Sequence, residues 1–190
     1  MRATARTAAV VVGATLIAAS GCAAPKIDLS GMQQPERPAE LAAFDAFVGK
    51  WNWQAEMVTA EGPDAKWTGT AEWNWALDQR WLHGRMSSKT ANAEFEAAGV
   101  WGWHPAKKQY IWYLFNNWGY PQEGNATYNE QTKTWVMNYT SVGLDGTTSH
   151  GYYRMTQAGP DLLEWQMHEW ADATRMFKKL EMTGSYQRQE

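Results

Sequence analysis

Hydrophobic and polar residues alternate with a period of two over most of the chain after residue 50. Alternation of this kind is typical of β-strands that bury one face and expose the other. In residues 67–77, for example, Trp67, Trp73, Trp75 and Leu77 share one face and the other face is mostly polar. The pattern predicts about ten strands, at residues 50–59, 66–77, 80–88, 94–104, 108–118, 122–129, 134–142, 147–157, 161–171 and 175–188.

Short turn sequences separate these segments at the spacing that hairpins need. Examples are Asp78-Gln79, Asp145-Gly146 and Gly159-Pro160. Short strands at such regular spacing indicate an antiparallel barrel or sandwich, and a closed barrel also removes exposed edges that invite aggregation. We therefore predict an all-β fold, an antiparallel up-and-down β-barrel of about ten strands.

One short helix is expected before the strands. Residues 39–48 place Leu41, Phe44 and Val48 at helical spacing, so a helix there could cover one end of the barrel. No comparable helix is predicted after Lys50.

The N-terminus has the features of an export signal. Arg2 and Arg6 precede an apolar stretch at residues 8–18, which is too short to span a membrane. Small residues then lead to Cys22 in a sequence that resembles a bacterial lipobox, although Ala19 stands where that motif usually has Leu. We expect residues 1–22 to be a lipoprotein signal peptide ending at a lipidated Cys22; the alternative is ordinary cleavage beside an incidental Cys.

Three segments follow from these boundaries. After the signal, residues 23–38 contain three prolines among polar residues and are expected to form a tether. Residues 39–190 are expected to form the barrel domain. Because Ala23 follows the Cys, the resemblance to Gram-negative lipoproteins implies an outer-membrane location facing the periplasm.

Composition narrows the possible partners. The net charge of -3 and the lack of a basic stretch argue against a nucleic-acid partner. Cys22 is the only cysteine, so no internal disulfide is possible and the fold depends on packing. With 13 Trp, 8 Tyr and 5 Phe, the chain has enough aromatic area to form a core.

The chain from Phe44 to Arg188 resembles a known bacterial family, the lipocalin-like domain of unknown function 1579. Four features carry the resemblance: Phe47-x-Gly49-x-Trp51, Trp75-x-Leu77-x-x-Arg80-Trp81-Leu82, Gly99-x-Trp101-Gly102-x-His104-Pro105-x-x-Lys108, and Tyr186-x-Arg188. The Gly-x-Trp pattern is shared with the calycins, which comprise the lipocalin and fatty-acid-binding barrels. The resemblance implies a calycin barrel in which Gly49 permits a sharp turn and Trp51 closes one end, but it implies no reaction.

Eleven tryptophans are expected to face inward if Trp51 does. They are Trp51, Trp53, Trp67, Trp73, Trp75, Trp101, Trp103, Trp112, Trp118, Trp135 and Trp165. Their indole rings either fill the interior or form the flat walls of a cavity suited to a planar or ring-shaped ligand. The candidate ligand-binding residues are Trp53, Trp73, Trp75, Trp101, Trp103, Trp112 and Tyr139.

Two arginines, Arg85 and Arg154, are further candidates, because a guanidinium group inside a barrel can bind a carboxylate with two hydrogen bonds. The alternative is a structural arginine stacked on Trp51 or a solvated outer face. Arg188 is the best candidate for the structural role, since the last strand lies beside the first in a closed barrel.

Catalytic and metal-binding motifs are not found. The four histidines show no metal-ligand spacing. Nitrobindin-like haem barrels resemble this architecture, but the candidate axial ligand, His168, is expected to lie opposite Trp165 on the outer face. Carboxylates are scattered, mostly at positions expected to face outward, and no nucleophile motif is present. We therefore expect no cofactor, no metal and no catalytic residue, and an enzyme is the less favoured alternative.

Two functions are favoured, and a haem-binding or enzymatic barrel is a further alternative. The first is a cell-envelope lipoprotein whose Trp-lined barrel binds a small apolar or ring-containing ligand. The second is a structural or interaction module of the envelope with a filled barrel.

Overall fold

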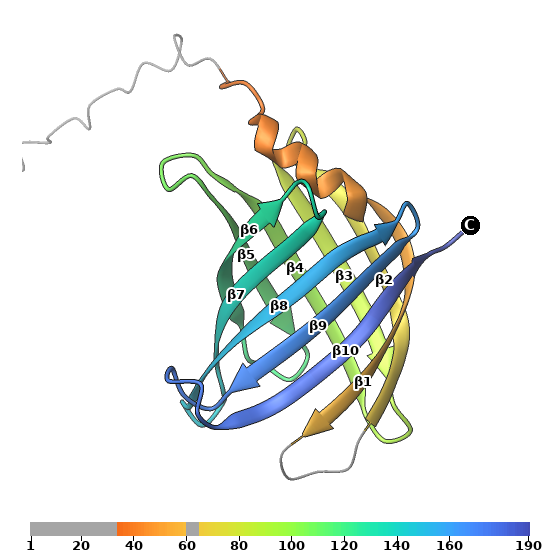
Figure 1. Ribbon diagram of the computed structural model, residues 1–190, viewed down its shortest axis with the longest axis vertical. Coiled ribbons are helices and arrows are strands. Elements are labelled where there is room, and N and C mark those ends of the chain that lie inside the picture. The colour runs from red at the N-terminus through yellow and green to blue at the C-terminus, as the bar shows by residue number, and fades with distance from the viewer. Residues whose placement is uncertain (1–33, 60–64) are drawn as a thin grey trace, which may run out of the picture. The chain divides into compact units, whose positions relative to one another are not determined.

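The computed structural model describes residues 34–59 and 65–190. Residues 36–190 form one compact unit, a closed antiparallel barrel in which each strand pairs with its neighbours in sequence and β1 pairs with β10 (Figure 1). The prediction of an up-and-down barrel is confirmed. Cys22, the signal and most of the tether lie outside the described residues. None of the helices in the described part of the chain is long and apolar enough to span a membrane.

Ten strands make up the wall, and their bounds lie within three residues of the predicted ones. They are β1 (Gly49–Thr59), β2 (Ala65–Ala76), β3 (Trp81–Lys89), β4 (Glu94–His104), β5 (Gln109–Asn116), β6 (Gln122–Asn129), β7 (Thr134–Val142), β8 (Thr148–Gly159), β9 (Leu162–Trp170) and β10 (Lys178–Arg188).

The predicted helix is present as η1 (Ala39–Phe47), a 3₁₀ helix at one end of the barrel (Figure 1). Its buried residues are Leu41, Phe44 and Phe47, and not Val48 as expected. The reason is geometric: a 3₁₀ helix has three residues per turn, so positions three apart share a face. The helix ends at Phe47, and Val48 is the capping residue that follows it.

Aromatic rings pack against one another beneath η1. Phe44 stacks on Trp135 with ring centroids 4.7 Å apart and meets Tyr110 edge-on at 5.3 Å. The Tyr110 hydroxyl donates a hydrogen bond to the Glu40 carbonyl at 2.9 Å, which fastens the helix to β5. This end is called the closed end below. The opposite end, formed by the β5–β6, β7–β8 and β9–β10 connections among others, is called the open end.

Candidate ligand-binding cavity

The barrel encloses a cavity of about 1000 Å³, at the upper end of the range for pockets that take drug-sized ligands. Its lining begins at Phe44 and Phe47 under η1 and extends to Met176 and Phe177 in the β9–β10 connection. Met176 is 76% exposed and Phe177 is 67% exposed, so the cavity reaches the surface at the open end.

Glycines explain how so aromatic an interior stays hollow. Five inward rings lie directly opposite a glycine on the next strand, in the pairs Trp53 with Gly69, Trp73 with Gly84, Trp112 with Gly124, Tyr139 with Gly151 and Trp165 with Gly184. A Cβ atom on Gly84 would lie 2.3 Å from the Trp73 ring, and one on Gly151 would lie 2.3 Å from the Tyr139 ring. The rings of Trp73, Trp112, Tyr139 and Trp165 therefore rest against the wall, where a side chain would otherwise stand, and leave the centre open.

Methionines supply the rest of the apolar lining. Every methionine in residues 34–59 and 65–190 lines the cavity, and these are Met57, Met86, Met137, Met155, Met167, Met176 and Met182. Met57, Met182 and Met167 are direct neighbours across β1, β10 and β9. Because methionine is unbranched and polarizable, it adapts to ligands of different shapes. The cavity thus combines flat indole rings with adaptable thioethers.

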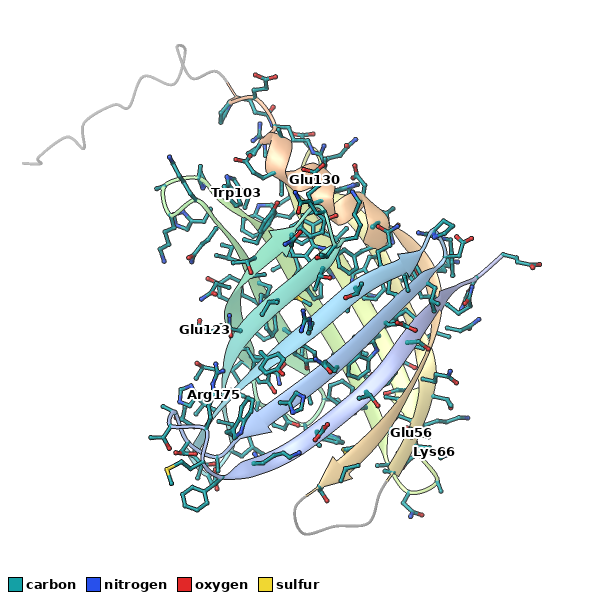
Figure 2. The ribbon with its side chains drawn as sticks, in the orientation of Figure 1. Glu56, Lys66, Trp103, Glu123, Glu130 and Arg175 are labelled. Carbon is teal, nitrogen blue, oxygen red and sulfur yellow. The ribbon has the colours of Figure 1, made fainter. Side chains whose placement is uncertain are left out.

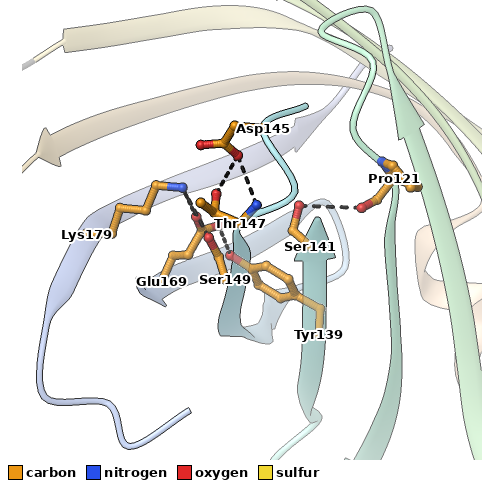
Figure 3. A network of polar contacts seen from close by, with 8 residues as sticks. All are labelled: Pro121, Tyr139, Ser141, Asp145, Thr147, Ser149, Glu169 and Lys179. Carbon is orange, nitrogen blue, oxygen red and sulfur yellow. Dashed lines mark hydrogen bonds and ion pairs between the residues drawn. The ribbon is translucent and has the colours of Figure 1, made fainter. Parts of the chain in front are cut away.

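A polar cluster lies at the open end of this otherwise apolar wall. Glu169 is only 7% exposed and accepts a hydrogen bond from the Tyr139 hydroxyl at 2.8 Å. The ammonium group of Lys179 is 3.1 Å from the other Glu169 oxygen and donates a second hydrogen bond to Ser149 at 3.1 Å (Figure 3). Glu169, Lys179 and Ser149 line the cavity, so the cluster can meet the polar end of a ligand.

The origin of the cluster lies in β9 and in an irregularity of β10. Glu169 follows Trp165 and Met167 at two-residue spacing, so it faces inward. Lys179 sits where the β9–β10 register shifts between Lys178 and Leu180. Glu169 is thus an exception to the expectation that most carboxylates face outward. Burial, with Glu169 and Tyr153 nearby, raises the pKa of Tyr139 far above its usual value, so this phenol stays a hydrogen-bond donor.

Several polar atoms in the cavity wall have no protein partner. Within the described residues, the buried indole N–H groups of Trp53, Trp67, Trp112 and Trp165 and the Gln122 side-chain oxygen make no hydrogen bond to the protein. Unsatisfied buried polar groups cost free energy and are rare in proteins, and ordered water or a bound group is one explanation for them. All five residues belong to the cavity lining.

The predicted tryptophans divide into two groups. Trp53, Trp73, Trp101 and Trp112 line the cavity. Trp75 and Trp103 face inward but pack at the closed end, outside the lining: the Trp75 N–H donates to Asp45 at 2.9 Å, and the Trp103 ring lies 4.8 Å from Tyr110. Figure 2 shows Trp103 close to η1. Tyr139 is buried beside the cavity, outside its lining, and donates its hydrogen bond to Glu169.

Trp118 departs from its predicted position in a strand. Strand β5 ends at Asn116, and Trp118 lies in the following connection, where its N–H donates to the Glu94 carbonyl at 3.2 Å. Its ring meets Trp67 and Phe95 edge-on and lines the open end of the cavity. The turn begins earlier because the Asn116 side chain caps it, accepting from the backbone N–H of Trp118 and donating to the Tyr120 carbonyl.

The two candidate arginines do not extend into the interior. Arg85 borders the cavity but its side chain is exposed, because its neighbour Gly84 takes the inward position under Trp73. Arg154 is likewise exposed, because its neighbour Met155 takes the inward position on β8. Neither guanidinium group is therefore buried inside the barrel, and a ligand contact by Arg85 at the cavity border stays a prediction.

Gly49, Trp51 and Arg188 form a structural cluster at the closed end. The Arg188 guanidinium group lies 4.2 Å from the centroid of the Trp51 ring and donates hydrogen bonds to the Val48 and Ala46 carbonyls. The Trp51 N–H donates to the Phe47 carbonyl at 2.7 Å. Gly49 has a φ of +124°, and a Cβ atom there would lie 2.6 Å from Arg188. The last strand thus joins the first strand to η1.

His168 lies on the outer face, as alternation indicates. Its ring stacks on Trp170 at 5.8 Å and on Tyr152 at 5.1 Å, so it does not enter the cavity. Across the described part of the chain, no group of three or more His, Cys, Asp or Glu side chains is arranged to hold a metal ion.

Sequence reasoning missed the methionine lining and the pairing of Glu169 with Lys179. Alternation from Trp165 places Glu169 inside, and it places Met137, Met155 and Met167 on inward faces, so this signal was present. Lys179 had no such signal, because a register shift interrupts the alternation there.

Solved structures show that the fold is shared with distant proteins. Rv2717c from M. tuberculosis matches with a TM-score of 0.62 at 10% identity, over 82% of this chain and 100% of that one. The S-type phycobiliprotein lyase CPES from Guillardia theta matches with a TM-score of 0.57 at 10% identity, over 81% and 94%.

The sequence matches none of the curated proteins. A family model described as "Protein of unknown function (DUF1579)" matches residues 36–188, which span the whole barrel and include Gly49, Trp51 and Arg188. The chain therefore belongs to the DUF1579 family.

Proposed function

We propose that this protein is a cell-envelope lipoprotein whose barrel binds a small, largely apolar ligand that contains rings. The observation that carries the binding role is the cavity of about 1000 Å³, walled by indoles and methionines and reaching the surface at the open end. A filled, purely structural barrel would not retain such a space, since protein interiors are normally close-packed.

The ligand is expected to place its rings against the indoles and a polar group near the open end. Lys179 already contacts Glu169 and Ser149, so the local charge is balanced. A neutral hydrogen-bonding group on the ligand suits this cluster better than a second full charge, because an uncompensated buried charge is costly.

Probe binding tests this role. The barrel unit, residues 36–190, is titrated with a hydrophobic fluorescent dye, and we expect saturable binding that ring-containing compounds displace. Ala97 lines the cavity, so Ala97→Phe fills part of it and should weaken binding. Ala158→Phe adds the same ring at an exposed position of β8 and should leave binding unchanged.

Near-ultraviolet circular dichroism shows whether each variant keeps its packed core. Non-saturable dye binding, or equal effects of the two substitutions in folded proteins, would contradict a ligand site inside the barrel. In that case the structural role becomes the better explanation.

The envelope location rests on the sequence of the leader, with lipidation at Cys22 and the outer membrane as its destination. Stable anchoring needs more than one acyl chain, which bacterial lipidation provides. We expect Cys22→Ser to release the protein from the membrane fraction while the barrel stays folded. Fractionation with the outer membrane in spite of that substitution would contradict the lipid anchor.

A further inference from the structure

Exposed apolar side chains are concentrated at the open end of the barrel. Among the described residues, nine large hydrophobic side chains are exposed, and seven of them lie at or next to this end. These are Val58, Phe115, Trp118, Val142, Leu144, Met176 and Phe177. Leu77 is the one at the closed end. Concentration of apolar surface on one side of a protein marks a contact surface.

The β9–β10 connection carries the most distinctive part of this surface. Arg175, Met176, Phe177, Lys178 and Lys179 are consecutive, and no acidic residue lies between positions 173 and 180. Arg175 is at the open end in Figure 2, with its guanidinium group 5.1 Å from the Trp170 ring. Lys178 forms an ion pair with Glu181 yet remains about half exposed. The exposed apolar side chains of Met176 and Phe177 therefore lie between cationic residues in the sequence.

We propose that the open end docks on a lipid surface, with Met176 and Phe177 inserted at the headgroup boundary and Arg175 and Lys178 on anionic phosphates. Apolar side chains flanked by cations are the usual chemistry of interfacial membrane contacts. The protein carries a net charge of -3, so this run of cationic residues is opposite in sign to the chain as a whole.

The mouth of the cavity lies at the proposed docking surface. Met176 and Phe177 both line the cavity and protrude from it, so docking brings the cavity mouth to the apolar part of the bilayer. An apolar molecule can then pass between membrane and barrel without crossing water. The docking surface itself does not depend on the proposed ligand, and the two are tested separately.

Vesicle co-sedimentation tests the docking. The barrel unit, residues 36–190, lacks Cys22 and therefore any lipid anchor. It is mixed with vesicles of phosphatidylcholine alone or of equimolar phosphatidylcholine and phosphatidylglycerol. We expect binding to the anionic vesicles, weakened by salt, and a loss of about tenfold or more in the Met176→Glu, Phe177→Glu double variant.

Leu77→Glu is the matched control, because Leu77 is 73% exposed at the closed end and its replacement should leave vesicle binding unchanged. Equal losses in the two variants, or no binding to either vesicle, would overturn the proposal. So would a concentration-dependent dimer in sedimentation velocity that the double variant abolishes, because a second copy would then be the occupant of this surface.

Discussion

The two ends of the barrel are built from the same ten strands but are packed in opposite ways. At the closed end Trp51 is 0% exposed, its N–H is bonded to η1, and Arg188 covers its ring. At the open end Met176, Phe177 and Leu144 are exposed, and the interior between them is a cavity.

The difference shows that aromatic content alone does not decide whether a barrel is filled. Under η1, rings meet other rings, as Phe44 meets Trp135 and Tyr110. Further down, rings such as Trp112 rest on a glycine of the next strand and leave the centre empty. We therefore expect substitutions at the closed end to change stability and substitutions at the open end to change binding.

The largest effect is expected for Trp51→Ala. Removing this buried indole leaves a cavity and an unpaired Phe47 carbonyl, so the free energy of unfolding should fall by about 3–5 kcal/mol, a large share of the total for one domain. Chemical denaturation measures it. A loss near 1 kcal/mol would mean that Trp51 does not hold the closed end.

Gly49→Ala is expected to cost about 1–3 kcal/mol, because the φ of +124° strains any other residue and the new methyl group collides with Arg188. Gly146→Ala is the control: φ there is +80°, but nothing lies within 4 Å of the added carbon. The difference between the two losses of stability measures the collision with Arg188 together with the greater backbone strain at a φ of +124°. If the losses are equal, that contact contributes nothing.

High pH should destabilise both ends. Burial raises the pKa of Tyr110 at the closed end to about 12, and burial does the same for Tyr120 at the open end. A pKa raised by folding means that the folded protein holds its proton while the unfolded chain loses it. The contribution of these two protonated phenols to the free energy of unfolding is therefore fully present below pH 10. It is lost as the pH rises from 10 to 12.

Denaturation midpoints across this pH range test the expected decline, with tyrosinate absorbance recorded in parallel. Tyr110→Phe should flatten part of the dependence. A midpoint that stays constant while the absorbance rises would contradict the assignment of buried phenols.

The smallest effect is expected for Trp170→Ala. Trp170 is only half-buried on the outer face of β9, where it stacks on His168 and Arg175, so its loss should cost under about 1 kcal/mol. Chemical denaturation of Trp170→Ala in parallel with Trp51→Ala compares the loss of stability at an outward and at an inward tryptophan. Similar losses would require the inside and outside assignments to be withdrawn.

The sequence by itself determined the elements and their order. A period of two residues is a local property, so the ten strands and the hairpin order could be predicted from it, and the resemblance that places Trp51 inside gave the inward direction of Trp53, Trp73 and Trp112. The helix before β1 could be located, but its 3₁₀ geometry could not, because Leu41, Phe44 and either Val48 or Phe47 fit one face.

Only the tertiary structure decided where the interior is filled and where it is empty. That outcome depends on which residue stands opposite each ring, and the cross-strand register that pairs Trp112 with Gly124 is not a local property. The contact of Glu169 with Lys179 depends in addition on a register shift in β10. The filled and empty regions and the Glu169–Lys179 contact both depend on how neighbouring strands pair. The local pattern of residues does not determine that pairing.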